Sequence, residues 1–334
     1  MAGSGTGHLR NNGDALLRVE HLVVEFPSSG GGKVHAVSDV SLDVMEGETL
    51  GLVGESGCGK STTGRAIIQL PRPSSGSVMF EGRDLTKLKG EELRMIRRRM
   101  QLIFQDPVSS LNPRRRVRDI VAEPLVIAGE KEARRHRVNE VLETVGLDPD
   151  VSDRRPHQFS GGQCQRVSLA RALIVDPTLL ICDEPVSALD VSVQAQILNL
   201  LEDMKGRYGL TMLFISHDLS VVKNISDRVM VMYLGKLCEL AQADTLYREP
   251  AHPYTNALLA SIPTVDNVVV SERVEQLKST ELPSPINPPS GCRFRTRCPR
   301  AQDICTSDEP TMRELRPGHF VACHFPVEVP VTAA

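Results

Sequence analysis

A glycine-rich segment in the first quarter of the chain has the residue types needed to bind a phosphate chain. It fits G-x-x-x-x-G-K-S and consists of Gly54, Glu55, Ser56, Gly57, Cys58, Gly59, Lys60 and Ser61, followed by Thr62. Glycines let the backbone wrap around phosphate oxygens, and the N-terminus of a following helix adds a favourable dipole. Lys60 would supply positive charge to the β- and γ-phosphates, and the Ser61 hydroxyl could bind Mg²⁺. The segment therefore predicts a phosphate-binding loop (P-loop) for a nucleoside triphosphate, in which Cys58 occupies a variable position of the motif.

Two acidic residues follow an apolar run later in the chain. The run 179–182 ends at Asp183 and Glu184. At the end of a strand, Asp183 would reach Mg²⁺ directly or through water, and Glu184 could orient or deprotonate an attacking water molecule. A solvated acidic turn after a buried strand is the alternative interpretation. The P-loop upstream favours a nucleotide-hydrolysing site.

Strands and helices alternate around these motifs. Apolar or alternating runs predict strands at 17–26, 36–44, 49–53, 100–104, 179–182 and 211–215. Helical periodicity predicts helices at 60–70 and 191–207. Residues 106–165 are charged and helix-rich, which predicts an inserted helical subdomain. The alternation predicts an α/β fold with a mainly parallel sheet.

The composition indicates which partners and which compartment to expect. A net charge of −3 does not indicate a generally basic nucleic-acid-binding protein, and we expect no nucleic-acid partner. No apolar run approaches the roughly 18 residues that cross a bilayer. Residues 1–14 are rich in Gly, Ser and Asn, so we expect a disordered tail without a secretory signal. We therefore expect a cytosolic protein that meets a membrane only through partner subunits.

Four cysteines gather in a proline-rich C-terminal segment. They are Cys292, Cys298, Cys305 and Cys323, with the spacing C-x₅-C-x₆-C-x₁₇-C. Four thiolates can hold a [4Fe–4S] cluster or a tetrahedral zinc ion, and free cysteines remain a third possibility. The close C-x₂-C pairs that favour zinc are absent. The arginines among them either offset thiolate charge or form a solvated basic tail: Arg293, Arg295, Arg297 and Arg300.

A second glycine-rich helix start narrows the family. It consists of Ser160, Gly161, Gly162 and Gln163, and it resembles the signature motif of ABC ATPases. In that family two nucleotide-binding domains pack head to tail, and each signature motif caps the ATP on the partner's P-loop. A helix cap alone would explain this motif in isolation. Its occurrence together with the P-loop and the acidic pair favours the ABC ATPase interpretation.

The remaining motifs of an ABC ATPase occur in the same order. Gln105 matches the Q-loop glutamine that reaches Mg²⁺ or its water, and Asp190 ends a match to the D-loop. His217 matches the switch histidine that senses the γ-phosphate. Phe26 is the candidate for stacking on adenine, with His35 as second choice. The resemblance implies a P-loop ABC ATPase with a RecA-like core sheet, an N-terminal antiparallel β subdomain, a helical subdomain and a Cys-rich C-terminal extension.

Three further features resemble the ATPase subunits of oligopeptide and dipeptide importers, and most closely the second ATPase subunit of such systems. They lie at 105–114, 249–255 and 288–292, the last leading into the four cysteines. The resemblance favours the [4Fe–4S] cluster. It implies ATP hydrolysis coupled to peptide uptake, with an ABC nucleotide-binding domain at 15–250 and an extension at 251–334. Relatives that move nickel, glutathione, opines or sugars leave other cargoes open.

The resemblance also implies a set of partners. They are a second ABC ATPase, which can be a different protein, two transmembrane permease subunits and an extracytoplasmic solute-binding protein. The subunit would sit peripherally at the cytoplasmic face of the cell membrane. Two other functions fit the sequence less well. A soluble ABC ATPase acting on DNA or ribosomes would carry tandem ATPase domains or coiled coils, which this sequence lacks. An iron–sulfur sensor would not need intact ATPase motifs, which this sequence has.

Overall fold

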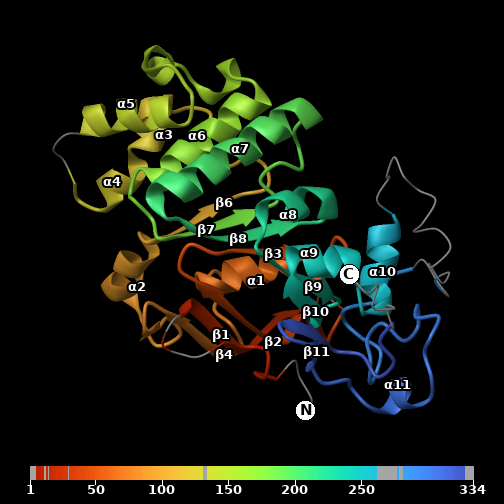
Figure 1. Cartoon of the computed structure of the whole chain (residues 1–334). Helices are drawn as coiled ribbons and strands as arrows, with labels where there is room; N and C mark the ends of the chain where they lie inside the picture. Colours follow the sequence, from red (N-terminus) through yellow and green to blue (C-terminus); the bar gives the residue numbers. More distant parts are fainter. Residues whose placement is uncertain are drawn as a thin grey trace. The chain divides into compact units, whose positions relative to one another are not determined.

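The computed structural model describes residues 5–10, 13, 15–28, 30–130, 134–261, 277 and 281–327 (Figure 1). Half of the tail predicted at 1–14 lies outside the described residues. The chain folds as two units. The first consists of Met1–Met45, Thr49–Thr86 and Ser216–Ala334, and the second of Glu46–Glu48 and Lys87–Ile215.

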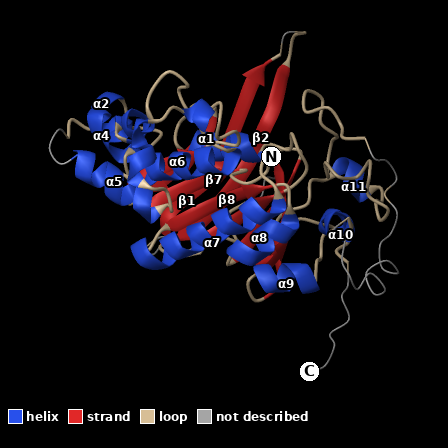
Figure 2. Ribbon diagram, turned by 90° about the horizontal axis from the view of Figure 1, so that it is seen from above, coloured by secondary structure: helices blue, strands red, loops and turns tan. Residues whose placement is uncertain are grey.

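The first unit contains an antiparallel sheet at the N-terminal end of the chain. Its long strands β1 (Ala15–Pro27) and β2 (Lys33–Met45) pair antiparallel, and Figure 2 shows them running side by side. Strands β4 (Ser75–Phe80) and β5 (Arg83–Asp84) complete the order β2-β1-β4-β5. Alternate residues of β1, such as Leu17 and Val19, are fully buried, as the period-two pattern predicts. The predicted antiparallel β subdomain is confirmed.

A second set of strands in the same unit carries the P-loop. Strand β3 (Thr49–Val53) is buried throughout and pairs parallel with β9 (Arg228–Tyr233). The order continues antiparallel through β10 (Lys236–Gln242), β12 (His319–Val321) and β11 (Arg313–Arg316). The strands from β9 to β12 were not predicted from the sequence. They join the C-terminal region to the strands that support the P-loop.

Five helices belong to the first unit. They are α1 (Lys60–Ile67), α8 (Leu219–Ile225), α9 (Ala243–Arg248), α10 (Pro253–Ala260) and α11 (Ile304–Ser307) among the described residues. Helix α1 starts where the P-loop ends, as the motif requires. It stops at Ile67, earlier than the predicted end at residue 70.

The second unit has three parallel strands and a helical region. Strands β6 (Met100–Ile103), β7 (Leu179–Asp183) and β8 (Thr211–Ser216) pair in the order β6-β7-β8. Its helices are α2 (Gly90–Arg97), α3 (Val117–Val121), α4 (Glu123–Ile127), α5 (Arg134–Thr144), α6 (Gly161–Leu173) and α7 (Val191–Tyr208), with 3₁₀ turns at Pro149–Asp153 and Pro156–Gln158. The described part of 106–165 holds helices and turns without strands. The predicted α/β class is confirmed.

Candidate functional site

The P-loop depends on glycines at two close approaches of the backbone. Gly54 and Gly59 have φ of 152° and 107°. A Cβ on Gly54 would lie 2.1 Å from the Met232 carbonyl oxygen, and one on Gly59 would lie 2.2 Å from the Ala36 carbonyl oxygen. Backbone atoms at that distance leave no room for any side chain. The loop can therefore take this path only with glycine at both positions.

Lys60 is held inside the loop. Its ammonium donates hydrogen bonds to the carbonyl oxygens of Gly54 (2.7 Å) and Glu55 (3.0 Å). The side chain is buried, so its charge is desolvated and directed into the loop. This arrangement presents a positive charge where phosphates would be wrapped. Cys58 is buried and burial raises its thiol pKa, which fits a packing residue and not a nucleophile.

In the second unit the structure brings Gln105 and Glu184 together. The Gln105 amide donates to a carboxylate oxygen of Glu184 at 2.8 Å. Glu184 has φ of 49° and donates its own N–H to the Ile215 carbonyl at 2.9 Å. A left-handed φ is costly for a residue other than glycine and is common at functional sites. Asp183, the last residue of β7, is fully buried. The contact joins two residues predicted independently from motifs 79 positions apart.

The signature residues cap helix α6. The Ser160 hydroxyl accepts the Gln163 N–H (3.3 Å), and the Gln163 side chain accepts the Ser160 N–H (3.0 Å). This reciprocal pair is a capping box, which orders the start of the helix. Ser160 and Gly161 are exposed and Gly162 is half-buried. The signature residues therefore do form a helix cap, as the alternative interpretation predicted. This cap leaves the N-terminal end of α6 exposed.

Gly162 also has a packing role. A Cβ there would lie 2.5 Å from a methyl group of Val193 in α7. Asp190 caps α7 by accepting the Val193 N–H at 3.0 Å and the Ser192 hydroxyl at 2.7 Å. Hydrogen bonding, first from Ser192, lowers the Asp190 carboxyl pKa. The signature and D-loop residues thus belong to neighbouring helix starts of one unit.

His217 and the adenine candidates lie in the first unit. His217 is exposed directly after β8, and Asp218 caps α8 by accepting the Ser220 N–H at 2.8 Å. Phe26 is near the end of β1, opposite Val34 of β2, with 37% of its surface exposed. His35 makes an ion pair with Glu25 at 3.0 Å. The His35 side chain is 34% exposed, so accessibility does not separate the two candidates.

The four C-terminal cysteines come together in the structure. Cys292, Cys298, Cys305 and Cys323 all line one small cavity, and none of them forms a disulfide. The Cys292 N–H donates to the Cys305 carbonyl at 2.9 Å. In the described part of the chain, no three His, Cys, Asp or Glu side chains are grouped to hold a metal ion.

Two residues that touch the P-loop were not predicted from the sequence to do so. The Glu55 N–H donates to the Tyr254 hydroxyl at 2.8 Å, and the Arg297 guanidinium donates to the Glu55 carboxylate. The solvated-tail interpretation is wrong for Arg297, which is buried. In the sequence, the only feature that drew attention to Arg297 was its position among the four cysteines.

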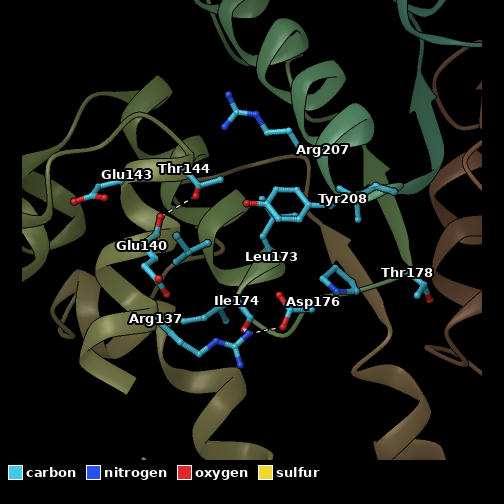
Figure 3. A pocket seen from close by; sticks show the side chains of 13 residues that line it. Arg137, Glu140, Glu143, Thr144, Leu173, Ile174, Asp176, Thr178, Arg207 and Tyr208 are labelled. Atoms are coloured by element: carbon cyan, nitrogen blue, oxygen red, sulfur yellow. Dashed lines mark hydrogen bonds and ion pairs between the residues drawn. The ribbon is translucent and has the colours of Figure 1, made fainter. Parts of the chain in front are cut away.

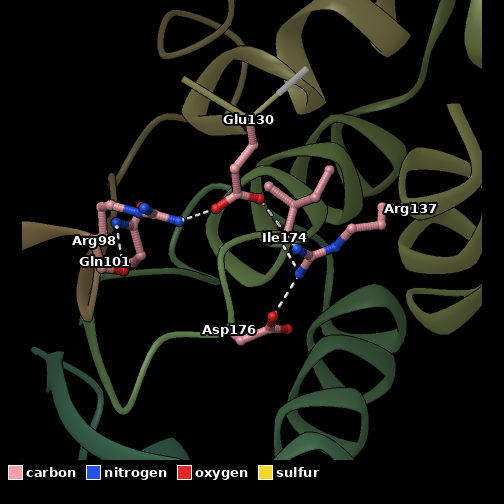
Figure 4. Close-up of polar contacts among 6 residues, drawn as sticks. All are labelled: Arg98, Gln101, Glu130, Arg137, Ile174 and Asp176. Atoms are coloured by element: carbon pink, nitrogen blue, oxygen red, sulfur yellow. Dashed lines mark hydrogen bonds and ion pairs between the residues drawn. The ribbon is translucent and has the colours of Figure 1, made fainter. Parts of the chain in front are cut away.

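A separate cavity of about 800 Å³ in the second unit contains none of the predicted site residues. Leu173 of α6 and Tyr208 of α7 lie beside it (Figure 3). A chain of ion pairs runs nearby, from Arg98 through Glu130 and Arg137 to Asp176 (Figure 4). These pairs tie the end of α2 to α5 and to the turn after α6, which is a structural role.

None of the described helices combines the length and the apolar composition that a bilayer span requires.

Comparisons with known proteins extend over nearly the whole chain. Residues 37–187 match the ABC transporter family model, and residues 238–305 match the oligopeptide/dipeptide transporter C-terminal region. The chain is 53% identical to the putative oligopeptide transport ATP-binding protein YkfD of Bacillus subtilis, over 93% of this chain and 95% of that protein. It is 50% identical to the oligopeptide transport ATP-binding protein OppF of Salmonella typhimurium, over 92% of this chain and 95% of that protein.

Solved structures agree with the fold. CbiO1 of Clostridium perfringens, part of an ABC transporter complex, matches with a TM-score of 0.62 at 29% identity, over 71% of this chain and 92% of that one. The dimeric cassette MJ0796 bound to ADP and Pi matches with a TM-score of 0.62 at 28% identity, over 68% of this chain and 98% of that one. These matches confirm the predicted ABC ATPase fold class. The chain belongs to the ATP-binding subunits of ABC transporters, in the oligopeptide and dipeptide transporter group.

Proposed function

We propose that this protein binds ATP with Mg²⁺ and hydrolyses it to drive peptide import through a membrane transporter. The observation that carries the proposal is the contact between Gln105 and Glu184, since it places two motif residues where they could act on one water molecule. The peptide cargo is supported by the match of residues 238–305 to the C-terminal region of oligopeptide and dipeptide transporters. Nickel, glutathione, opines and sugars are the alternative cargoes.

Each P-loop residue has a defined task in this proposal. Backbone N–H groups between Gly54 and Thr62 wrap the phosphates, except that of Glu55, which donates to Tyr254. Lys60 keeps its two carbonyl partners and offers its third ammonium N–H to a phosphate oxygen. Ser61 would bind Mg²⁺, which when present neutralises phosphate charge. Phe26 stacks on the adenine ring through its exposed face. The donor set of hydroxyl, amide and carboxylate oxygens fits the preference of Mg²⁺ for oxygen.

Residues of the second unit act on the water and the metal. Glu184 orients the attacking water and accepts its proton, and Gln105 positions the carboxylate through their hydrogen bond. Asp183 contributes to the Mg²⁺ shell. His217, in the first unit, senses the γ-phosphate. The left-handed backbone at Glu184 is consistent with a carboxylate held in one orientation.

Family membership implies dimerisation and permease partners. We propose that the exposed start of α6, at Ser160 and Gly161, caps ATP on the P-loop of a second ATPase, with Asp190 and Gln163 alongside. Helix N-termini favour anions. The second ATPase, two permease subunits and an extracytoplasmic solute-binding protein complete the proposed transporter, with this subunit at the cytoplasmic face of the cell membrane.

A [4Fe–4S] cluster is a second proposal, carried by the four cysteines that line one cavity. The residues fit such a group because they offer four cysteine side chains, none of them in a disulfide. Zinc held by the same four cysteines is the alternative, and metal analysis distinguishes the two. When bound, the cluster would order a segment that has few apolar residues of its own.

Peptide uptake by cells tests the main proposal. Cells lacking the gene are complemented with the wild-type protein or with Lys60→Ala, and uptake of a radiolabelled tripeptide is measured. We expect uptake with the wild type only. Normal tripeptide uptake in the gene-deficient cells, with loss of nickel, glutathione, opine or sugar uptake instead, would replace the cargo and leave the ATPase assignment in place.

A further inference from the structure

The side chain of Glu55, the second residue of the P-loop, is held by the C-terminal region. Arg297 Nη1 donates to Glu55 Oε2 at 2.6 Å, and Arg297 Nη2 donates to Glu55 Oε1 at 2.9 Å. The two residues are 242 positions apart in the sequence. A bidentate pair of this kind fixes orientation as well as distance.

The main chain of Glu55 is also held by hydrogen bonds. Its N–H donates to the Tyr254 hydroxyl at 2.8 Å, and its carbonyl accepts the Lys60 ammonium at 3.0 Å. The carboxylate and the N–H of Glu55 therefore face residues of the C-terminal region, while its carbonyl faces the lysine. Glu55 connects Lys60 to that region through a continuous chain of hydrogen bonds.

Arg297 is itself fixed in place. Its side chain is 4% exposed, and its guanidinium lies 5.7 Å from the Tyr233 ring centre and 5.9 Å from that of Phe294. The Tyr254 ring packs against the same two rings at 4.7 and 5.3 Å. The Arg297 N–H donates to the Phe294 carbonyl at 3.0 Å. Arg297 cannot turn to solvent without unpacking this aromatic cluster.

We propose that Arg297 and Tyr254 are positioning residues for ATP binding, which act through Glu55 to hold the P-loop and Lys60 in the nucleotide-binding conformation. The inference rests on the proposed function of the loop. A glycine-rich loop has high backbone freedom, and ordering it before binding removes that entropic cost from the affinity. Neither residue needs to touch the nucleotide.

Arg297 also links ATP binding to the cysteine-rich segment. It lies next to Cys298, on the turn that begins at Cys292. Any change that disorders this turn would withdraw the guanidinium from Glu55. ATP affinity therefore depends on the order of the cysteine-rich segment.

The test measures ATP affinity of the full-length protein by equilibrium titration with a fluorescent ATP analogue. Arg297→Met keeps a long side chain but removes the charge and both donors. We expect the Kd for ATP to rise about 10- to 100-fold, and KM to rise more than kcat falls. Arg248→Met is the matched control, because Arg248 belongs to the same unit but lies exposed at the end of α9, outside the turn that carries Arg297. Its Kd should equal that of the wild type.

Tyr254→Phe provides a variant that keeps the ring packing and deletes one oxygen. We expect roughly a 2- to 10-fold rise in Kd, with an unchanged melting temperature in the absence of nucleotide. This variant decides the matter if Arg297→Met does not fold. Wild-type affinity in a folded Arg297→Met or in Tyr254→Phe, or an equal loss in Arg248→Met, would overturn the inference.

Lys60→Ala separates this inference from the proposed function. If the wild type does not bind ATP, or Lys60→Ala binds as tightly as the wild type, the P-loop assignment fails and the positioning role fails with it. If Lys60→Ala loses binding while Arg297→Met and Tyr254→Phe do not, only the positioning role is overturned.

Discussion

Replacing Gly59 by alanine should damage ATP binding far more than the change of one methyl group implies. The new Cβ would lie 2.2 Å from the Ala36 carbonyl oxygen, whereas contacts under 3.0 Å force some group to move. The carbonyl belongs to strand β2, which is paired along its length, so the start of α1 must give way. The required shift is on the order of 1 Å, and a displacement of about that size can cost about 10²-fold in function.

Gly82→Ala is the matched control for Gly59→Ala. Gly82 also has a left-handed backbone, with φ of 73°, but no atom lies within 4 Å of the position that a Cβ would take there. Both substitutions force alanine into a left-handed conformation at roughly 1–2 kcal/mol, and only Gly59→Ala adds a backbone collision. ATP titration and thermal melting of both variants separate the two costs.

For Gly59→Ala we expect about a 100-fold loss of ATP affinity and a lower melting temperature. For Gly82→Ala we expect a modest loss of stability with unchanged affinity. Equal ATP affinity in the two variants would show that the close approach at Ala36 does not shape the loop.

Three other predictions concern separate parts of the protein. Lys60→Ala should raise the Kd for ATP by about 10-fold or more, because it removes the charge held at the centre of the loop; unchanged affinity in a titration would contradict the P-loop assignment. Ser160→Arg should abolish ATP turnover in the assembled transporter and leave ATP binding to its own P-loop intact. Ser160→Ala, which loses only the cap at about 1 kcal/mol, is its control, and loss of binding to the P-loop of the altered chain would refute the head-to-tail arrangement. Protein purified without oxygen should contain iron and sulfide, and Cys305→Ser should lower both along with stability; zinc, or no metal, in the anaerobic wild type would reject the cluster.

Local patterns in the sequence predicted much of the nucleotide-binding apparatus. Strand β3, the glycine loop and α1 are consecutive, so residue types and short spacings suffice to predict them. The burial of β7 and the acidic pair after it follow from one apolar run. The contact of Gln105 with Glu184 was also within reach, because both residues follow neighbouring parallel strands, whose carboxyl ends meet at one edge.

Long-range contacts were beyond sequence reasoning. Strands β11 and β12 are short, and β12 pairs with β10 across a long stretch of chain. Such pairing leaves no local periodicity to detect. The pair of Glu55 with Arg297 was missed for the same reason, since a surface arginine and a buried one look alike in sequence. The cysteine cavity was anticipated only because cysteines are few and were grouped.

ATP turnover by Glu184→Gln tests the central claim most directly. The substitution keeps the size of the side chain and removes its ability to accept a proton from water. We predict ATP affinity near that of the wild type, and hydrolysis slower by about 100-fold or more. Hydrolysis at the wild-type rate with ATP binding intact would contradict the account.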